Sequence, residues 1–227
     1  MNIAILGTGP VGQTLAAKLD TLGHTVTIGT RDVTATLARE TKDSFGNPPY
    51  RTWATAHPRV ALESFATAAA RGEVVINALT GAGALSGLVL AGEANLADKI
   101  LLDLSNPLDF SKGVPPSLAV SNTDSLGEQI QRAFPKARVV KTLNTVNAYL
   151  MVDPAQLAGG DHSMFVAGND VDARRKVAGY LEEWFGWRDV IDLGDITTAR
   201  GMEMLLPLWL RTWGALQTPM FAFKVVR

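Results

Sequence analysis

Cysteine is absent from this 227-residue chain. Its absence excludes disulfides, thiolate zinc sites, iron–sulfur clusters and cysteine nucleophiles, so redox chemistry would need a bound cofactor. An excess of one charge is also lacking, because 21 basic residues stand against 22 acidic ones and the net charge is -1. A chain without a basic excess cannot neutralise the phosphates of a nucleic acid or hold an anionic membrane. We therefore expect neither nucleic acid nor a membrane as a partner.

Long hydrophobic runs are missing as well. The most apolar later stretch, Met204–Leu210, contains Pro207 and is far too short to span a membrane. The first apolar run ends at Gly7 and has no cationic segment before it, unlike a signal peptide. These features predict a cytoplasmic protein.

Hydrolytic and metal-binding patterns are absent too. The histidines His24, His57 and His162 are scattered and none has a partner at metal-ligand spacing, so we expect no metal. Neither G-x-S-x-G nor a Walker lysine occurs. Asp192 and Asp195 flank Gly194, and a turn with a helix N-cap explains this pair better than paired catalytic carboxylates.

The sequence does contain short aliphatic runs that alternate with segments of helical period. This alternation predicts an α/β fold with a doubly wound, mostly parallel Rossmann sheet. The expected strands are 2–6, 25–29, 59–62, 74–78, 100–104, 139–143 and 164–167. The clearest expected helices are 11–22 and 171–185, and Asp170 is the predicted N-cap of the second.

The composition changes after about Val146. We expect a Rossmann domain over residues 1–146 and a small C-terminal α/β domain over 147–227, with one short strand, two helices and an extended tail. The last helix, 197–216, is apolar around much of its circumference. It either packs beneath the Rossmann domain or forms a homodimer interface that also closes a pocket. The Gly- and Pro-containing loop Asp43–Trp53 is a candidate lid.

The segment Gly7-Thr8-Gly9-Pro10-Val11-Gly12 matches G-x-G-x-x-G. It directly follows an expected strand and opens an amphipathic helix, which is the context that dinucleotide binding requires. Gly7 permits the sharp turn, Gly9 lets the backbone approach a pyrophosphate, and Gly12 lets helix and strand pack closely. This motif predicts a dinucleotide site.

The end of the second expected strand indicates which dinucleotide binds. Thr30 takes the position that faces the adenosine ribose, where NAD-specific sites have a carboxylate. The guanidinium of the next residue, Arg31, can bind a 2′-phosphate through two hydrogen bonds. Asp32 comes later and suits a helix N-cap. The segment favours NADP over NAD, with a solvated surface role as the alternative for Arg31.

Neutral segments follow three of the later strands, namely Asn77–Thr80, Ser105–Pro107 and Asn144–Ala148. Each alone could be an ordinary polar turn. Reduction of a carbonyl or imine needs a proton donor, whereas hydride transfer to a stacked flavin-like ring depends mainly on holding two rings about 3–3.5 Å apart. A neutral rim therefore indicates a flavin-like acceptor. Lys141 is the one alternative proton donor.

With these motifs in view, the chain resembles the coenzyme F420-dependent NADP reductases, in particular their bacterial branch. It is more distantly similar to the reductase domain of the STEAP metalloreductases. The most specific segments are Asn106–Phe110, Asn122–Glu128 and Asp192–Ile196. The archaeal reductases have a segment like His-Thr-Ile-Pro-Ala at the positions where this chain has Asn144–Ala148. They also lack a loop like Asp43–Trp53.

The resemblance implies NADP(H) across the switch point of the sheet, with the ring of F420 or of a flavin (FAD or FMN) stacked on the nicotinamide. The expected cofactor-binding residues are Gly7, Thr8, Gly9, Pro10, Val11, Gly12, Thr30, Arg31, Ala78, Leu79, Thr80, Asn106 and Val146. The residues expected to position the stacked ring are Asn144, Thr145, Asn147 and Ala148.

Three functions remain open from the sequence. The first is an NADPH-dependent oxidoreductase that exchanges hydride with a stacked deazaflavin or flavin, its partner being this small molecule. The second is a non-catalytic sensor or scaffold that binds NADP(H). The third is a small imine or carbonyl reductase that uses Lys141.

Overall fold

The protein is described by a computed structural model over residues 1–42 and 46–227. Its framework is an eight-stranded sheet with the order β10-β9-β8-β5-β4-β1-β2-β3. The strands of this sheet are β1 (Asn2–Leu6), β2 (Thr25–Thr30), β3 (Ala61–Ser64), β4 (Val74–Asn77), β5 (Ile100–Asp103), β8 (Arg138–Thr142), β9 (Ser163–Ala167) and β10 (Asp189–Asp192). All neighbours run parallel except β8 and β9, which are antiparallel.

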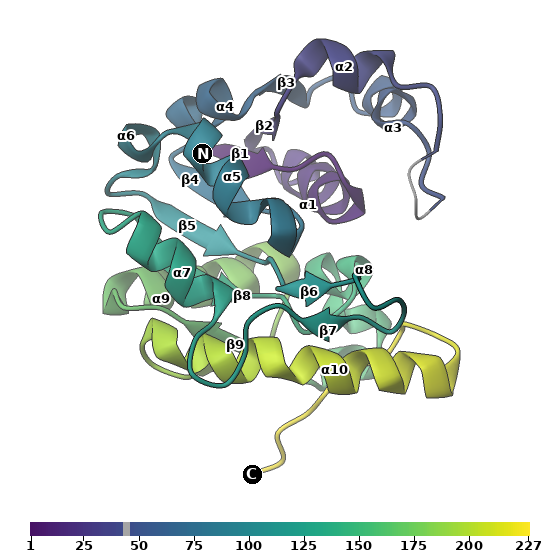
Figure 1. The fold of residues 1–227 in the computed structure, drawn as a ribbon, viewed down its shortest axis with the longest axis vertical. Coiled ribbons are helices and arrows are strands. Elements are labelled where there is room, and N and C mark those ends of the chain that lie inside the picture. Colours follow the sequence, from purple (N-terminus) through teal and green to yellow (C-terminus); the bar gives the residue numbers. More distant parts are fainter. Residues whose placement is uncertain (43–45) are drawn as a thin grey trace.

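The helices cover both faces of this sheet (Figure 1). They are α1 (Pro10–Thr21), α2 (Val33–Ala38), α3 (Tyr50–Ala56), α4 (Phe65–Arg71), α5 (Gly81–Ala91), α6 (Glu93–Leu96), α7 (Leu126–Ala133), α8 (Ala148–Val152), α9 (Val171–Tyr180) and α10 (Ala199–Leu216). A short antiparallel hairpin joins β6 (Leu108–Asp109) to β7 (Ser117–Leu118).

Alternating side chains on the strands feed two hydrophobic clusters, one on each face. Ile3 and Ile5 of β1 belong to the cluster with α1, α8 and α9. Ala4 and Leu6 belong to the cluster with α4, α5 and α7. Because both faces of β1 are covered, this strand is apolar throughout, as central parallel strands usually are.

The predicted fold class is confirmed. The order β3-β2-β1-β4-β5-β8 is the Rossmann order. Its switch point, from which successive strands are added on opposite sides, lies between β1 and β4. The expected strand 59–62 was placed two residues too early, since β3 spans Ala61–Ser64. The exposed Arg59 instead pairs with Asp20 on the surface.

The C-terminal part differs from the prediction in two respects. It contains two strands, β9 and β10, where we expected one, and three α-helices, α8, α9 and α10, where we expected two. The missed strand, β10, is a short, half-buried strand that pairs with β9. Both strands continue the main sheet beyond β8. The boundary between residues 1–146 and 147–227 remains a prediction.

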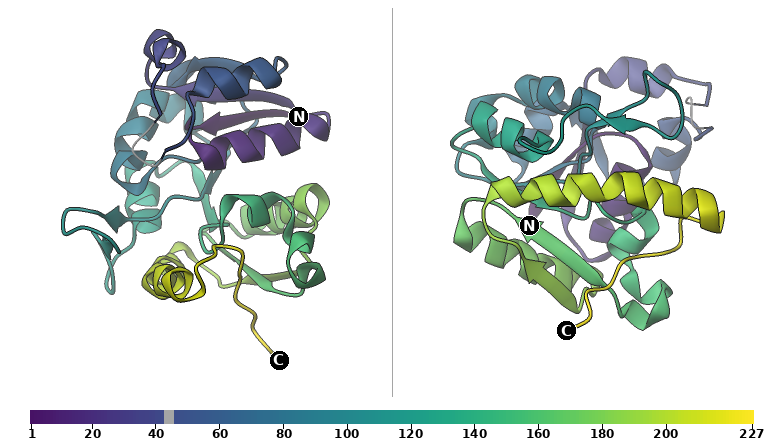
Figure 2. Two further views of the ribbon diagram at one scale, coloured as in Figure 1. Left: turned by 90° about the vertical axis from the view of Figure 1, so that its right-hand side faces the viewer. Right: turned by 60° about the horizontal axis from the view of Figure 1, so that its bottom comes forward.

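The helix α10 crosses the C-terminal part beside the β6–β7 hairpin, and the tail leaves from its far end (Figure 2). It continues through Pro207. One face is buried through Met202, Glu203, Leu206 and Trp209, which confirms that this helix packs on the body of the protein. Leu208 lies on the opposite face and is exposed, whereas Trp213 and Leu216 continue the buried stripe toward the C-terminal end of the helix and are exposed there.

The helix caps follow the sequence. Asp170 accepts a hydrogen bond from the backbone N–H of Ala173, as predicted for the start of α9. The expected single helix 171–185 is α9 followed by one π-helical turn, Leu181–Phe185. The loop predicted over Asp43–Trp53 ends earlier, because α3 begins at Tyr50 behind Pro49. Residues 43–45 of that loop lie outside the described residues.

Candidate active site at the carboxyl edge of the sheet

The parallel strands β1, β2, β4, β5 and β8 all end at one edge of the sheet. In open α/β sheets, ligands bind outside this edge at the switch point, which lies here between β1 and β4. The backbone ties the strand ends together, since Gly7 donates to Gly29 O and Ala78 donates to Leu6 O, each over 3.0 Å. We call this edge, together with the loops that follow its strands, the rim. These hydrogen bonds fix the backbone of the rim around the switch point.

The three glycines of the first turn have the geometry that their predicted roles require. Gly7 has φ +127°, and a Cβ there would lie 2.7 Å from Ala78 O. A Cβ on Gly12 would lie 2.2 Å from Gly7 O, so only glycine lets α1 start this close to β1. A Cβ on Gly9 would contact nothing within 4 Å. The turn thus leaves the backbone at the N-terminus of α1 uncovered, and the role of Gly9 toward a pyrophosphate stays a prediction.

The end of β2 separates two neighbouring polar roles. The Asp32 carboxylate accepts from Ala35 N over 2.9 Å and caps α2, as predicted. Thr30 is buried, and its hydroxyl lies 2.8 Å from that of Thr36. Arg31 is exposed and has no ion-pair partner among the described residues. The Asp32 carboxylate is therefore occupied as a helix cap, while the Arg31 guanidinium is available to an anion.

The loops after β4 and β5 form the middle of the rim. Ala78 and Leu79 are half-buried and Thr80 is exposed, immediately before α5. Asn106 exchanges two hydrogen bonds with Asn144, because its Nδ2 donates to Asn144 O and its Oδ1 accepts from Asn144 Nδ2. This pair joins the end of β5 to the end of β8.

The segment after β8 is placed mainly to support this edge. Asn144, Thr145 and Val146 are buried. Asn144 also donates to Met202 O of α10 over 3.1 Å. Asn147 caps α8 by accepting from Tyr149 N, and its amide donates to Pro219 O. Side chains in this segment thus hold the backbone in place, and only Asn147 and Ala148 are partly exposed.

A buried ionic network lies beneath the rim. The ammonium of Lys141, on β8, is fully buried and lies 2.8 Å from Asp103 Oδ2 and 2.7 Å from Glu203 Oε1. It also donates to Ser105 O. Glu203, on α10, accepts from the backbone N–H groups that start α7, at Leu126 and Gly127. The network joins β5, β8, α7 and α10.

The partners of Lys141 in this network bear on whether it could donate a proton to a substrate. Burial tends to lower the pKa of Lys141, but the charges and hydrogen bonds of Asp103 and Glu203 outweigh it and hold that pKa above its usual value. All three ammonium protons have acceptors inside the protein. The side chain therefore serves the fold and is poorly suited to protonating a substrate at the rim.

The other polar side chains considered in the sequence have structural partners. Asp192 accepts from Gly194 N, and Asp195 accepts from Thr197 N, so the predicted turn and N-cap are confirmed. His162 is buried against Trp187. Within the described residues, no three His, Asp or Glu side chains form a group that could hold a metal ion. No helix in that part of the chain is long and apolar enough to cross a membrane.

Comparison with known proteins identifies the family. Residues 2–107 match the family model described as NADP oxidoreductase, coenzyme F420-dependent. A crystal structure from Arthrobacter sp. FB24, of a protein named as a candidate F420-dependent NADP reductase, is 60% identical over the full length of both chains, with a TM-score of 0.95. The chain belongs to the coenzyme F420-dependent NADP oxidoreductase family. It is accordingly an NADP-dependent oxidoreductase, and the non-catalytic alternative is not retained.

Two further comparisons give more distant likenesses. The metalloreductase STEAP3 of Rattus norvegicus is 26% identical over 212 residues, which are 92% of this chain and 38% of STEAP3. The chain therefore spans less than half the length of this curated relative. An imine reductase of Streptomyces aurantiacus is 21% identical, with a TM-score of 0.62 over 96% of this chain and 63% of that one. This last likeness shows a shared fold.

Sequence reasoning missed two groups of residues in this family member. Asp103 and Glu203 were not connected to Lys141. Asp103 and Lys141 each interrupt an apolar strand, which was a signal that they pair, whereas Glu203 on α10 gave no such signal. The polar residues on the outer face of α1, including Gln13 and Lys18, were also missed. With Thr14, Ala17 and Thr21 they recur at spacings of three and four residues, which marks one helix face, and the structure shows that this face lines a groove.

Proposed function

We propose that this oxidoreductase transfers a hydride between NADP(H) and the ring of a deazaflavin or flavin stacked on the nicotinamide. The observation that carries the proposal is the neutral rim. The segments 78–80, 105–107 and 144–148 contain no acidic, basic or tyrosine side chain. Lys141, the alternative proton donor, is buried with its acceptors inside the protein.

The dinucleotide fits the first turn and the end of β2. The open backbone face at Gly9 and the N-terminus of α1 suit the pyrophosphate, and Arg31 suits the 2′-phosphate. Ala78, Leu79 and Thr80 would then contact the ribose of the nicotinamide half. When bound, NADPH supplies the hydride, and water supplies the proton that accompanies it.

The contribution of the protein would be to hold the two stacked rings in place. The reciprocal Asn106–Asn144 pair and the Asn147 cap hold the backbone of the β5 and β8 loops, so two flat rings between them would keep one separation. Such positioning is the main requirement for hydride transfer between stacked rings.

Anaerobic mixing tests the proposal. Purified protein with NADPH should bleach oxidised F420 or FMN, and NADH should serve much less well. Absorbance at the acceptor's own maximum follows the reaction, and protein-free mixtures give the background. Turnover of cyclic imines or ketones without reduction of any deazaflavin or flavin would contradict the proposal.

We also propose that the chain forms a homodimer through the exposed apolar residues of α10. Leu208, Trp213 and Leu216 are 55%, 43% and 54% exposed, and Trp213 and Leu216 extend the buried stripe of the helix, so a second copy would continue its packing. Sedimentation velocity should give twice the mass of the chain. A single monomer boundary at micromolar concentrations would contradict it.

A further inference from the structure

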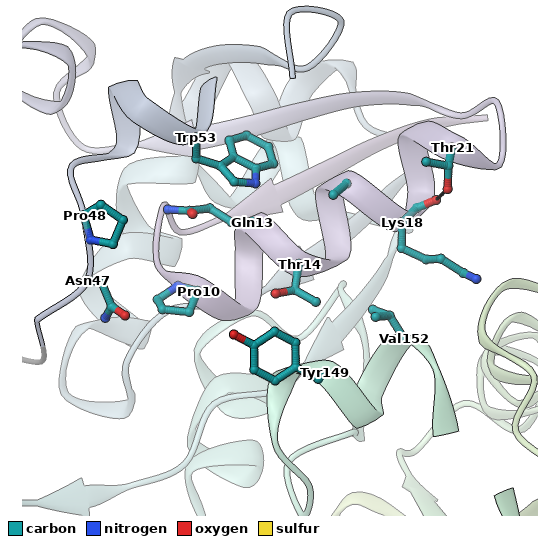
Figure 3. A pocket seen from close by; sticks show the side chains of 11 residues that line it. Pro10, Gln13, Thr14, Lys18, Thr21, Asn47, Pro48, Trp53, Tyr149 and Val152 are labelled. Atoms are coloured by element: carbon teal, nitrogen blue, oxygen red, sulfur yellow. Dashed lines mark hydrogen bonds between the residues drawn. The ribbon is translucent and has the colours of Figure 1, made fainter. Parts of the chain in front are cut away.

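A groove of about 570 Å³ runs along the outer face of α1 (Figure 3). Its floor is formed by α1, one wall by the segment that leads into α3, and the other wall by α8. The lining residues are Pro10, Gln13, Thr14, Ala17, Lys18, Thr21, Asn47, Pro48, Trp53, Tyr149 and Val152. Apart from Pro10, none of these residues has a role in the cofactor or ring site described above.

One end of the groove adjoins the segments of the proposed hydride-transfer site in the chain. Pro10 is the first residue of α1 and follows Gly9 of the pyrophosphate turn. Tyr149 follows Ala148, the last residue of the segment that frames the stacked ring. The helices α1 and α8, which line the groove, therefore each begin at a segment of the proposed site. A substituent that leaves a ring in the site has this groove as a path along α1.

The charge in the groove favours an anion. Lys18 is the one charged residue among its lining residues and is half-buried. No carboxylate in the described part of the chain forms an ion pair with Lys18, and none lines the groove. Lys18 lies in the last turn of α1, whose carbonyls balance part of its charge, and without a carboxylate partner its ammonium attracts a negatively charged group.

The remaining lining suits a polar chain with apolar stretches. Gln13 donates one amide hydrogen to Thr8 O over 2.7 Å, which fixes its side chain at the mouth of the groove. Thr14, one helical position further on, adds a hydroxyl. Trp53 and Tyr149 flank the groove from opposite walls, and Figure 3 shows both rings directed toward α1. Hydroxyls on the floor and aromatic rings on the walls suit a polyol.

We propose that this groove binds the ribityl phosphate side chain of the acceptor, with the phosphate on Lys18. The inference rests on the proposed function, because FMN and the deazaflavin cofactor both carry a ribityl phosphate on the ring that stacks. The loop before α3 supplies one wall, so this subsite belongs to the branch of the family with that loop. The ring would be held by the rim and the side chain by α1.

Riboflavin, which lacks the phosphate, provides the matched ligand for a test. Steady-state kinetics with saturating NADPH would compare FMN, F420 and riboflavin for the wild type, Lys18→Met and Lys136→Met. Lys136 is exposed, precedes β8 and does not line the groove, so it serves as control. In Lys18→Met, we expect KM for FMN and F420 to rise about two- to fivefold, as for loss of a partly exposed ion pair.

The other values should stay at the wild-type level: KM for riboflavin, KM for NADPH, and kcat for every acceptor. A rise in KM for riboflavin as large as that for FMN would overturn the assignment, and so would a rise confined to NADPH, which would place part of the dinucleotide in the groove. No change for FMN and F420 would overturn it as well.

A binding measurement separates this inference from the proposed function. Fluorescence titration of FMN and riboflavin in the presence of NADP⁺ needs no turnover. The wild type should bind FMN more tightly than riboflavin, and Lys18→Met should remove that preference. Equal affinities in the wild type would overturn the groove assignment even if both compounds are reduced. A preference that depends on Lys18, without reduction of any acceptor, would support the groove and contradict the proposed hydride transfer.

Discussion

Replacement of Lys141 by Met is expected to lower the free energy of unfolding by about 3–5 kcal/mol, the usual cost of removing one partner from a buried ion pair. The substitution leaves Asp103 and Glu203 buried without their counterion, and methionine fills the volume without replacing the charge. Urea denaturation followed by circular dichroism measures the change.

Lys136→Met is the control for this variant, because Lys136 is exposed and its substitution should change the stability by less than about 0.5 kcal/mol. If Lys141→Met unfolded at the wild-type urea concentration but lost its reductase activity, the structural role would be wrong. Lys141 would then be a proton donor, and the imine or carbonyl reductase would become the better hypothesis.

Replacement of Arg31 by Gln is expected to weaken NADPH binding about 10- to 100-fold and to leave NADH binding nearly unchanged. Hydrogen bonds to a charged group are worth about 1.5–3 kcal/mol, and the guanidinium is proposed to contact the phosphate that NADH lacks. Calorimetric titration with both dinucleotides measures the two affinities.

A matched control for Arg31 is Arg188→Gln, another exposed arginine, which precedes β10 at the opposite end of the sheet. It should bind both dinucleotides like the wild type. Equal losses of NADPH and NADH affinity in Arg31→Gln would mean that Arg31 supports the site in general and does not select the phosphorylated form.

The parts of the site that the sequence predicted depend on local structure. The turn from β1 to α1 needs glycine at Gly7 and Gly12, because a Cβ at either would collide with backbone carbonyls nearby. The cap at Asp32 involves a residue three positions away. Signals of this range are contained in a window of a few residues, so the pattern alone specified the first βαβ unit.

The parts that the sequence did not predict depend on distant residues. The partners of Lys141 come from β5 and α10, and the register that sets Asp103 opposite Lys141 exists only in the folded sheet. The strand β10 has few apolar residues and is stabilised by pairing with β9. The groove along α1 needs α8, whose residues lie more than a hundred positions further along the chain.

The antiparallel joint between β8 and β9 has a mechanical consequence. Hinge bending needs a few connecting residues that are free to change their backbone angles. Here Lys141 and Thr142 pair with Ala167 and Val166, and the Thr142 hydroxyl donates to Phe165 O. The sheet is thus continuous from the Rossmann strands through β8 to β9 and β10, and the paired residues between β8 and β9 do not form a hinge. Ligands would then be exchanged by local rearrangement of surface segments, with the two halves turning as one rigid unit.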